Sequence, residues 1–303
     1  MLVSIFLSDI LPIFLIASVG FVLSRWMHAN VKTAAHIVFY ALLPCLVFNL
    51  LVKSSINATQ FGQMALLAVL CVCSMGGIGY LVSRPIGLSR PELSAFLLVV
   101  MISNGGNYGL PVVLFAFGTE ALNYAVVFFV VSSILTNTLG VFIAAAGHKS
   151  VRGAIAGIFR TPVIYSVAAA ALVRSAAIAL PDGVARPVDL LSDAALPVMI
   201  LVLGMQLERA ARPKRLAPVA VAVALSLLVA PIVAYELTTV LGIAGAARQA
   251  GVLLASMPVA VITTVLALEF ELEPTFVTAT VFASTVLSPF TLTLLIAYLK
   301  QAS

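Results

Sequence analysis

Long stretches without a charged side chain recur along the whole 303-residue chain, and they constrain its fold more than any other feature. A run of about 20 apolar residues is long enough to cross the hydrocarbon core of a bilayer as an α-helix. The composition agrees, because 62% of the residues are hydrophobic and 9% are charged, whereas soluble domains carry about a quarter charged residues. The sequence therefore predicts an all-α polytopic membrane protein and excludes a soluble globular fold.

The charge-free stretches predict ten transmembrane helices. The connections between them are too short to hold a soluble domain, and the N-terminal segment lacks the basic start of a cleaved signal peptide. We therefore expect the first apolar run to be retained as a span. The predicted spans are 5–24, 33–52, 61–83, 93–118, 121–146, 161–179, 188–207, 216–241, 247–268 and 274–299.

The basic residues lie mainly in short connections, where they act as topology signals rather than as a nucleic-acid patch. Of the 16 Lys and Arg residues, 11 fall in the connections on one side of the predicted membrane and five on the other. The positive-inside rule places the richer side in the cytoplasm and both termini outside. The alanine-rich composition and the short loops favour a bacterial inner membrane, so both termini are expected in the periplasm.

Similar features recur at a spacing of five predicted spans, which indicates an internal repeat. Pro44 in the second span matches Pro197 in the seventh, and the fourth and ninth spans are broken at 104–111 and 256–258. Because five is odd, the second half must be inverted relative to the first, as in many secondary transporters. The predicted organisation is a first five-helix repeat (1–146), a short cytoplasmic loop (147–160) and a second, inverted five-helix repeat (161–303).

The two broken helices predict a crossing near the middle of the membrane. Proline and glycine interrupt the helical hydrogen bonds, and such breaks survive in a bilayer only inside protein or beside a cavity. The half-helix N-termini bring partial positive charge and free N–H groups to the crossing, which favour a carboxylate or another anion. Polar or flexible groups near the breaks that are candidates for binding are Asn104, Gly105, Asn107, Tyr108, Ser256, Thr263 and Thr264.

Other polar side chains in the predicted spans extend the candidate set. Ser132 and Asn137 lie along the fifth span, and Asn49 follows Pro44 in the second. Serine and threonine hydroxyls in membrane helices often bond to their own helix, so an asparagine is the more informative residue. Asn49, Asn104 and Asn137 are therefore the first candidates for substrate contact.

Acidic residues are absent from the centres of the third, fourth, fifth, ninth and tenth predicted spans. Asp193 and Glu236 lie nearer to helix ends, and each is a candidate proton acceptor, although solvated acids at the membrane surface are the simpler interpretation. The three cysteines and three histidines show no metal-ligand spacing. Because hydrolase, phosphate-binding and metalloprotease motifs are also absent, we expect no enzymatic activity, no cofactor and no metal site.

An ordered set of motifs along nearly the whole chain resembles the auxin efflux carrier family in its short bacterial form, related to the plant PIN-FORMED carriers. Ser103 departs from the plant pattern, in which proline precedes the asparagine of the first crossing. The motifs that carry the resemblance are Leu11-Pro12, Leu43-Pro44, Phe48-Asn49, Asn104 to Pro111, Gly118, Met257-Pro258, Glu269-Phe270, Pro274 and Ser284 to Ser288.

The resemblance implies an elevator-type transporter of organic acids, such as auxin or malate- and malonate-type anions. Helices 1, 2, 6 and 7 would form a scaffold domain, and helices 3–5 and 8–10 a transport domain with crossing discontinuous helices 4 and 9. A homodimer is compatible with the resemblance. The positions it implies for substrate binding or the crossing are Val47, Asn49, Asn104, Pro111, Ser132, Asn137 and Pro258.

The residues leave two alternatives open. A sodium-coupled organic-anion symporter of the bile-acid type resembles this fold, and Asn104, Ser256, Thr263 and Thr264 would supply oxygen ligands, although without a carboxylate. A non-transporting membrane receptor or assembly subunit would use small-residue patches such as Gly76-Gly77 as partner contacts. The paired central breaks favour transport, because a receptor has no need of them.

Overall fold

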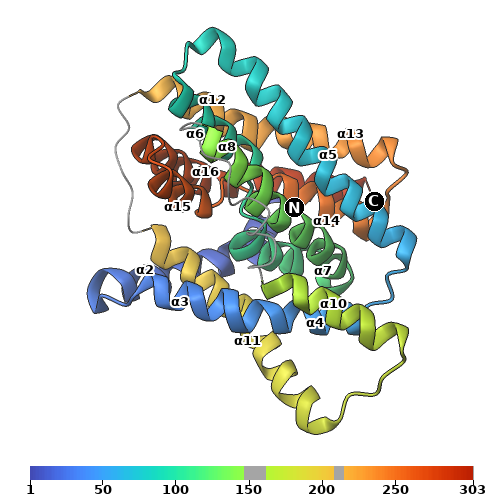
Figure 1. Cartoon of the computed structure of the whole chain (residues 1–303). Helices are drawn as coiled ribbons and strands as arrows, with labels where there is room; N and C mark the ends of the chain where they lie inside the picture. Colours follow the sequence, from blue (N-terminus) through green and yellow to red (C-terminus); the bar gives the residue numbers. More distant parts are fainter. Residues whose placement is uncertain (147–161, 208–214, 303) are drawn as a thin grey trace.

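The computed structural model describes residues 1–146, 162–207 and 215–302, and the elements named within these ranges are helices (Figure 1). The predicted cytoplasmic loop 147–160 lies outside the described residues. The basic residues Arg209, Arg212 and Lys214, which contribute to the predicted topology, also lie outside them.

Local sequence signals set several helix boundaries in the first half of the chain. Asn57 and Ser89 each cap a helix and form a capping box with Gln60 and Glu92, respectively. Gly118 adopts a φ of 78°, which is accessible to glycine without strain, and it kinks the long helix α7. The elements are α1 (Leu2–Ile5), η1 (Phe6–Ile10), α2 (Leu11–Met27), α3 (Val31–Ile37), η2 (Val38–Leu42), α4 (Leu43–Lys53), α5 (Ala58–Ser83), η3 (Arg84–Ile86), α6 (Arg90–Met101), η4 (Gly105–Gly109), α7 (Leu110–Leu135), η5 (Thr136–Gly140) and α8 (Val141–Ala146).

The second half of the described chain contains its longest α-helix, α16. Helix α16 runs for 28 residues and includes Pro289 in its interior, and α11 includes Pro187 and Pro197. The elements are α10 (Pro162–Ser175), α11 (Asp182–Leu207), α12 (Leu216–Ala224), η6 (Leu225–Val229), α13 (Ala230–Val240), α14 (Gly245–Ala255), α15 (Ile262–Glu269) and α16 (Pro274–Gln301).

Seven helical stretches within the described residues are long and apolar enough to cross a membrane. One of them, 105–146, contains the Gly118 kink and covers parts of two predicted spans. The predicted spans 93–118 and 247–268 are each interrupted, and 161–179 corresponds to the 14-residue helix α10. The polytopic helical class is thus confirmed, while the predicted number of ten spans depends on how these shorter helices are counted.

Four proline-containing spans share a local feature that the sequence patterns did not predict. A π-helical turn ends two residues before each of Pro12, Pro44, Pro111 and Pro231. Proline lacks an N–H, and its ring clashes with the preceding turn of an α-helix, so a wider turn accommodates the ring. At Pro12, Pro44 and Pro231 the chain therefore stays helical through the proline.

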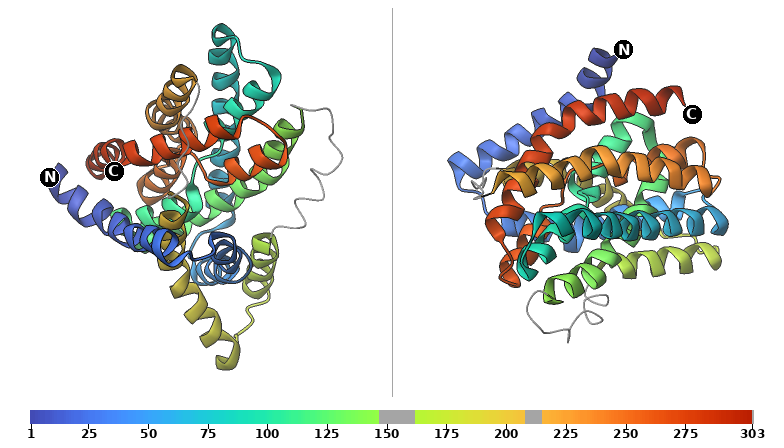
Figure 2. Two further views of the ribbon diagram at one scale, coloured as in Figure 1. Left: turned by 90° about the vertical axis from the view of Figure 1, so that its left-hand side faces the viewer. Right: turned by 90° about the horizontal axis from the view of Figure 1, so that it is seen from above.

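The helices gather into two bundles, which are visible in two orientations (Figures 1 and 2). The first bundle consists of α2, α3, α4, α10 and α11, in which α11 contacts α2, α3 and α4, and α10 contacts α4. The second bundle consists of α5–α8 and α12–α16. Helix α7 packs mainly on α5 and α14 in the second bundle and also touches α4 and α11 in the first.

Helices α2 and α11 approach each other backbone to backbone in the first bundle. Gly20 lies against the Leu201 carbonyl, and Gly204 lies against the Ala17 carbonyl, so closely that a Cβ atom on either glycine would overlap that backbone. Small residues allow this close packing in membrane proteins, where van der Waals contact replaces the hydrophobic drive between helices. Both glycines are therefore required for the observed crossing of α2 and α11.

Two ion pairs link helices that are distant in the sequence, and they differ in how far their carboxylates are exposed. Lys53 Nζ lies 2.7 Å from Asp189 Oδ1 within the first bundle, and Lys300 Nζ lies 2.6 Å from Asp9 Oδ2 between α16 and the first span. The Asp189 side chain is 42% exposed, whereas that of Asp9 is 6% exposed. The second pair joins the two bundles near the neighbouring chain termini (Figure 2).

Candidate functional site

The first helix break lies between α6 and η4. Helix α6 ends at Met101, Ile102 is extended with φ −108° and ψ 99°, and the chain turns at Asn104 before the π-helical turn begins at Gly105. The consecutive glycines Gly105 and Gly106 disfavour a continuous helix here. The observed break (102–104) overlaps the predicted one (104–111) only at Asn104, because the chain is helical again from Gly105 and stays helical through Pro111.

The second break lies between α14 and α15. Helix α14 ends at Ala255, Ser256 is its C-cap, and helix α15 starts at Ile262. Pro258 has no N–H and disfavours a helical conformation for Met257, so the helix stops here. Both Ser256 and Pro258 are buried.

The two breaks pair with each other through their backbones. Ser103 and Val259 form an isolated antiparallel β-bridge. Ala260 N–H donates to the Ile102 carbonyl at 3.0 Å, and Asn104 N–H donates to the Pro258 carbonyl at 2.7 Å. Each break thus satisfies backbone groups that the other leaves free, which meets the requirement for internal hydrogen bonding within a membrane.

Serine side chains from neighbouring elements complete this arrangement. Ser103 Oγ donates to the Leu254 carbonyl at 3.0 Å, Val259 N–H donates to Ser284 Oγ at 3.1 Å, and Ser226 Oγ lies 3.4 Å from the Met257 carbonyl. Ser226 and Ser284 were not predicted as part of the crossing. The resemblance did include Ser284, but only as part of a motif, without a structural role.

Asn104 is the most informative side chain of the first break. The residue is 6% exposed, and its buried Nδ2 atom has no hydrogen-bond partner among the described residues. An unpaired amide N–H in a low-dielectric interior carries a large free-energy cost, unless a ligand or water accepts its hydrogen bond. Asn104 therefore holds a buried donor that no described residue uses.

Unlike the Asn104 amide, the Tyr108 side chain has its partners within the protein. Its side chain is fully buried, its hydroxyl lies 3.1 Å from Ser288 Oγ on α16, and its ring meets Phe14 edge-on with 6.0 Å between ring centroids. These contacts join η4 to both α2 and α16. The structure therefore shows a packing role for Tyr108, while its predicted role in substrate binding stays a prediction.

Several other candidate residues lie at the crossing with their polar groups already bonded locally. Ser256 Oγ donates to the Val252 carbonyl and Thr263 Oγ1 to the Ala260 carbonyl, each at 2.6 Å. Gly105, Gly109 and Pro111 are buried in the first break, and Asn107 is half-buried there.

The candidates on the second and fifth predicted spans separate between the bundles. Val47 is buried and Asn49 half-buried on α4 of the first bundle. Ser132 lies on α7 near the crossing, whereas Asn137 Nδ2 donates to the Ser133 carbonyl of its own helix at 2.9 Å. The structure thus brings Ser132 to the breaks and gives the Asn137 amide a local partner.

The two candidate coupling acids are exposed. Asp193 lies on α11 and Glu236 on α13, and neither side chain is enclosed by the described residues. This placement agrees with the simpler interpretation of surface acids. Within the described residues no group of three or more His, Cys, Asp and Glu side chains is arranged to hold a metal ion.

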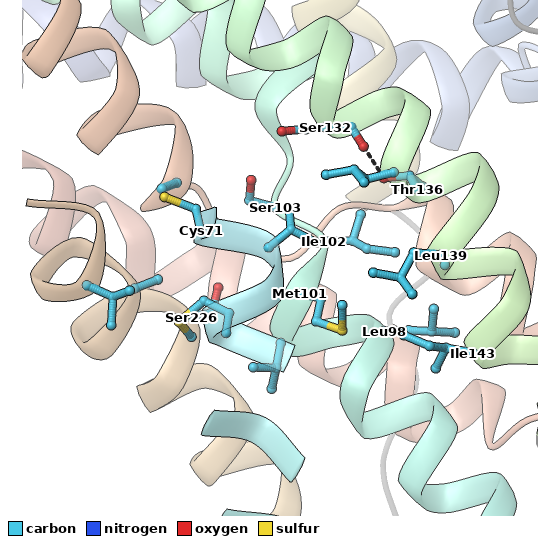
Figure 3. Close-up of a pocket in the computed structure, with 18 of the residues that line it drawn as sticks. Cys71, Leu98, Met101, Ile102, Ser103, Ser132, Thr136, Leu139, Ile143 and Ser226 are labelled. Atoms are coloured by element: carbon cyan, nitrogen blue, oxygen red, sulfur yellow. Dashed lines mark hydrogen bonds between the residues drawn. The ribbon is translucent and has the colours of Figure 1, made fainter. Parts of the chain in front are cut away.

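The helix ends give the crossing two faces of opposite polarity. Helices α6 and α14 end there, and their last carbonyls lack helical partners and carry partial negative charge. The helical segments that start at Gly105 and Ile262 bring partial positive charge. A cavity of about 30 Å³ lies beside the two carbonyl ends, and its polar lining consists mainly of hydroxyl groups (Figure 3).

Comparison with known proteins identifies the family to which this chain belongs. A family model described as membrane transport protein matches residues 5–155 and 148–296. The chain is 27% identical over 271 residues to a protein called an uncharacterized transporter from Methanothermobacter thermautotrophicus, with 86% of each chain covered. It is 26% identical over 269 residues to another uncharacterized transporter, from Methanocaldococcus jannaschii, again with 86% of each chain covered.

The two matched segments are of similar length and together cover nearly the whole chain, in agreement with two repeats. They confirm the predictions of a transporter rather than an enzyme and of an integral membrane protein. The resemblance that was based on motifs is confirmed as well. The chain belongs to the membrane transport protein family, which includes the auxin efflux carriers.

Proposed function

We propose that this protein is a secondary transporter that moves a small organic anion, a carboxylate of malate, malonate or auxin type, across the membrane. The carboxylate binds at the crossing of the two broken helices. The observation that carries the proposal is the buried Asn104 amide, which has an unpartnered N–H donor directly before the helical segment that starts at Gly105. An N–H donor and the positive end of a helix both favour a negatively charged guest.

The binding face lies between the first break and the first bundle. The η4 turn contacts α11, and a Cβ placed on Gly106 would lie 3.6 Å from Met199 Cε of that helix. The same Cβ would lie 2.9 Å from Phe129 Cε2, so the absence of a side chain at Gly106 lets α7 and α11 pack close to the η4 backbone. Asn104, Gly105, Asn107 and Pro111 form its floor, with Pro258 and Ser256 on the opposing break.

We assign the first bundle to a scaffold domain and the second bundle to a transport domain. The grouping of α2, α3 and α4 with α10 and α11 supports this assignment, since these are predicted spans 1, 2, 6 and 7. Because the breaks lie in the second bundle, a sliding movement of that bundle would carry the bound anion across the membrane. This is elevator-type alternating access, and it needs no covalent chemistry.

The proposal includes ten spans in two inverted five-helix repeats. The antiparallel pairing of Ser103 with Val259 supports an approximate twofold relation between the fourth and ninth spans. The distribution of Lys and Arg supports cytoplasmic loops and periplasmic termini in a bacterial inner membrane. Asp193 and Glu236 are the proposed proton acceptors if transport is proton-coupled, and a homodimer is compatible with the free outer faces of the first bundle.

Flux in proteoliposomes that contain only this protein tests the proposal. Radiolabelled malate, malonate and indole acetate are offered with and without a pH gradient. Loss of a hydrogen bond to a charged ligand should lower flux in Asn104→Ala about 10- to 100-fold. Asn123→Ala on α7, beyond the Gly118 kink, serves as the matched control and should transport as the wild type does.

Two outcomes contradict the proposal in different ways. Wild-type flux in Asn104→Ala would remove the site from the crossing but leave the transporter. Absence of flux for every anion, from protein shown to be folded by its cooperative melting, would favour a receptor or assembly subunit instead. Saturable flux by the purified chain alone would exclude that alternative.

A further inference from the structure

The cavity beside the crossing differs from the proposed anion face in its chemistry and position. It lies within the second bundle and is lined by α5, α6, α7, η5, α8, η6 and α13, with Ala255 at the end of α14 (Figure 3). No residue of the first bundle lines it among those described. Its polar side chains are Cys71, Ser103, Ser132, Thr136 and Ser226, and no charged side chain belongs to the lining.

The hydroxyl groups of the cavity present oxygen lone pairs rather than protons. Ser103 Oγ donates its proton to the Leu254 carbonyl at 3.0 Å, and Thr136 Oγ1 donates to the Ser132 carbonyl at 2.9 Å. Ser226 Oγ lies 3.4 Å from the Met257 carbonyl, in the same donor geometry. Since each hydroxyl has one proton, its remaining capacity toward the cavity is as an acceptor.

Ser132 adds a buried hydroxyl without a partner in the described part of the chain. Its Oγ atom is buried and makes no hydrogen bond with any described residue. Buried hydroxyl groups are nearly always satisfied, so this atom indicates a guest that the protein chain does not supply. The space of about 30 Å³ is enough for one or two water-sized species and too small for a dicarboxylate.

The backbone adds negative potential at the same place. Val100 and Met101 at the end of α6 and Ala255 at the end of α14 line the cavity, so the carbonyl ends of two broken helices converge there. Half-helix C-termini and unwound carbonyls are the groups with which secondary transporters hold small cations. An anion is disfavoured here for the same reason.

We infer that this cavity is a binding site for a monovalent alkali cation of the size of Na⁺, with Ser103, Ser132, Thr136 and Ser226 as oxygen ligands. Small hard cations take oxygen ligands, and the four hydroxyl groups of the lining offer oxygen. The site differs from the sodium ligands expected from the sequence, because Ser256 and Thr263 do not line this cavity. It also assigns Ser132 to the cation rather than to the organic anion.

The two proposed sites lie beside neighbouring residues of the first break. Ile102 and Ser103 line the cation cavity, whereas Asn104 is not part of that lining. The cation would therefore bind beside the carbonyl ends of α6 and α14, and the anion beside Asn104 and the start of η4.

Thermal unfolding of the purified protein without any organic anion tests the site. NaCl replaces choline chloride at constant ionic strength, and LiCl and KCl are compared. Binding to the folded state should raise the melting temperature by about 2–4 °C in Na⁺ at concentrations well above its Kd, and less in K⁺. Ser132→Ala and Thr136→Val should lose most of this shift while melting like the wild type in choline. Thr138→Ala is the control, because its hydroxyl bonds to the Ile134 carbonyl outside the cavity.

Three outcomes would overturn the inference: equal melting in Na⁺ and choline, a shift of equal size for every cation, or a Na⁺ shift that both cavity variants retain. The result is independent of the proposed anion site, since no anion is present. A Na⁺ shift that persists in Asn104→Ala while flux is lost supports both proposals. A Na⁺ shift without any anion flux contradicts only the proposed transport of an organic anion.

Discussion

In the first bundle, α2 and α11 meet through Gly20 and Gly204 with no side chain between them, whereas the second bundle surrounds its centre with serine and threonine hydroxyls. Direct backbone packing leaves little freedom for the helices to shift, because any displacement brings bulkier residues into the contact. The crossing in the second bundle instead joins two irregular backbone segments through hydrogen bonds to each other and to serine side chains. Close backbone packing is thus a feature of the first bundle, and polar side chains are a feature of the centre of the second.

The largest expected effect breaks the glycine contact of the first bundle. Gly204→Val places a branched side chain where a Cβ alone would overlap the Ala17 carbonyl, so it should destabilise the fold by more than about 3 kcal/mol. Gly77→Val on α5 is the control, since no atom lies within 4 Å of its Cβ position. Melting temperatures in detergent measure the difference, and similar values for the two variants would refute the backbone contact.

A second substitution removes one hydroxyl from the centre of the second bundle. Ser284→Ala leaves the buried Val259 N–H without its acceptor, which should cost about 1–3 kcal/mol. Thr285→Val removes a neighbouring buried hydroxyl that donates only to the Val281 carbonyl of its own helix, and it should cost less than about 1 kcal/mol. Chemical denaturation of both variants checks this, and equal losses would show that Ser284 does not support the crossing.

The ion pair between Asp9 and Lys300, which joins the bundles, should contribute less to the stability of the fold than the Ser284 hydrogen bond does. Lys300→Met leaves the buried Asp9 carboxylate with only Ser8 as a described side-chain partner, at an expected cost of about 1–2 kcal/mol because Lys300 itself is partly solvated. Lys53→Met removes the exposed pair inside the first bundle and should cost less than about 1 kcal/mol. Melting experiments compare the two variants. A larger loss of stability in Lys53→Met than in Lys300→Met would show that burial of Asp9 does not strengthen the pair between Asp9 and Lys300.

The smallest effect concerns Glu92 at the start of α6. The Ser89 backbone N–H, and to a smaller extent Arg215, hold the pKa of this carboxyl below its usual range. A lowered pKa in the folded state stabilises the protein above the unfolded pKa, and this stability is lost as pH falls through the folded value. Glu92→Gln should therefore be less stable than the wild type at pH 7, by less than about 1 kcal/mol, and the difference should vanish once the pH lies well below the lowered pKa of the folded state. A difference that persists in acid would contradict the role of the charge.

The sequence predicted where the backbone breaks, because proline and paired glycines act locally. Ser256 to Pro258 lie at the second interruption, Asn104 lies at the end of the first, directly before the helical residues 105–111, and Gly118 marks the kink between two predicted spans. The partners of the freed backbone groups were not predictable in the same way. The bridge between Ser103 and Val259 joins residues that are far apart along the chain, and no periodicity encodes such a pairing.

For the candidate site, too, the sequence predicted which residues to consider but not the partners that the fold gives them. Asn104 was chosen because an asparagine is costly to bury, and the structure shows a buried amide without a described partner. Asn137 met the same criterion, but its amide bonds to the Ser133 carbonyl one turn earlier. Ser226 was not singled out, since a single serine in an apolar helix carries no signal until the fold places it beside Met257.

The bridge between the two breaks has a consequence for how such a chain tolerates insertions and deletions. Adding one residue between Ile102 and Asn104 would shift the pairing of this segment with the second break by one position. The Asn104 N–H would then no longer face the Pro258 carbonyl. A length change in one crossing segment is therefore expected to need a matching change in the other, so an evolving gene must keep its two crossing segments in step.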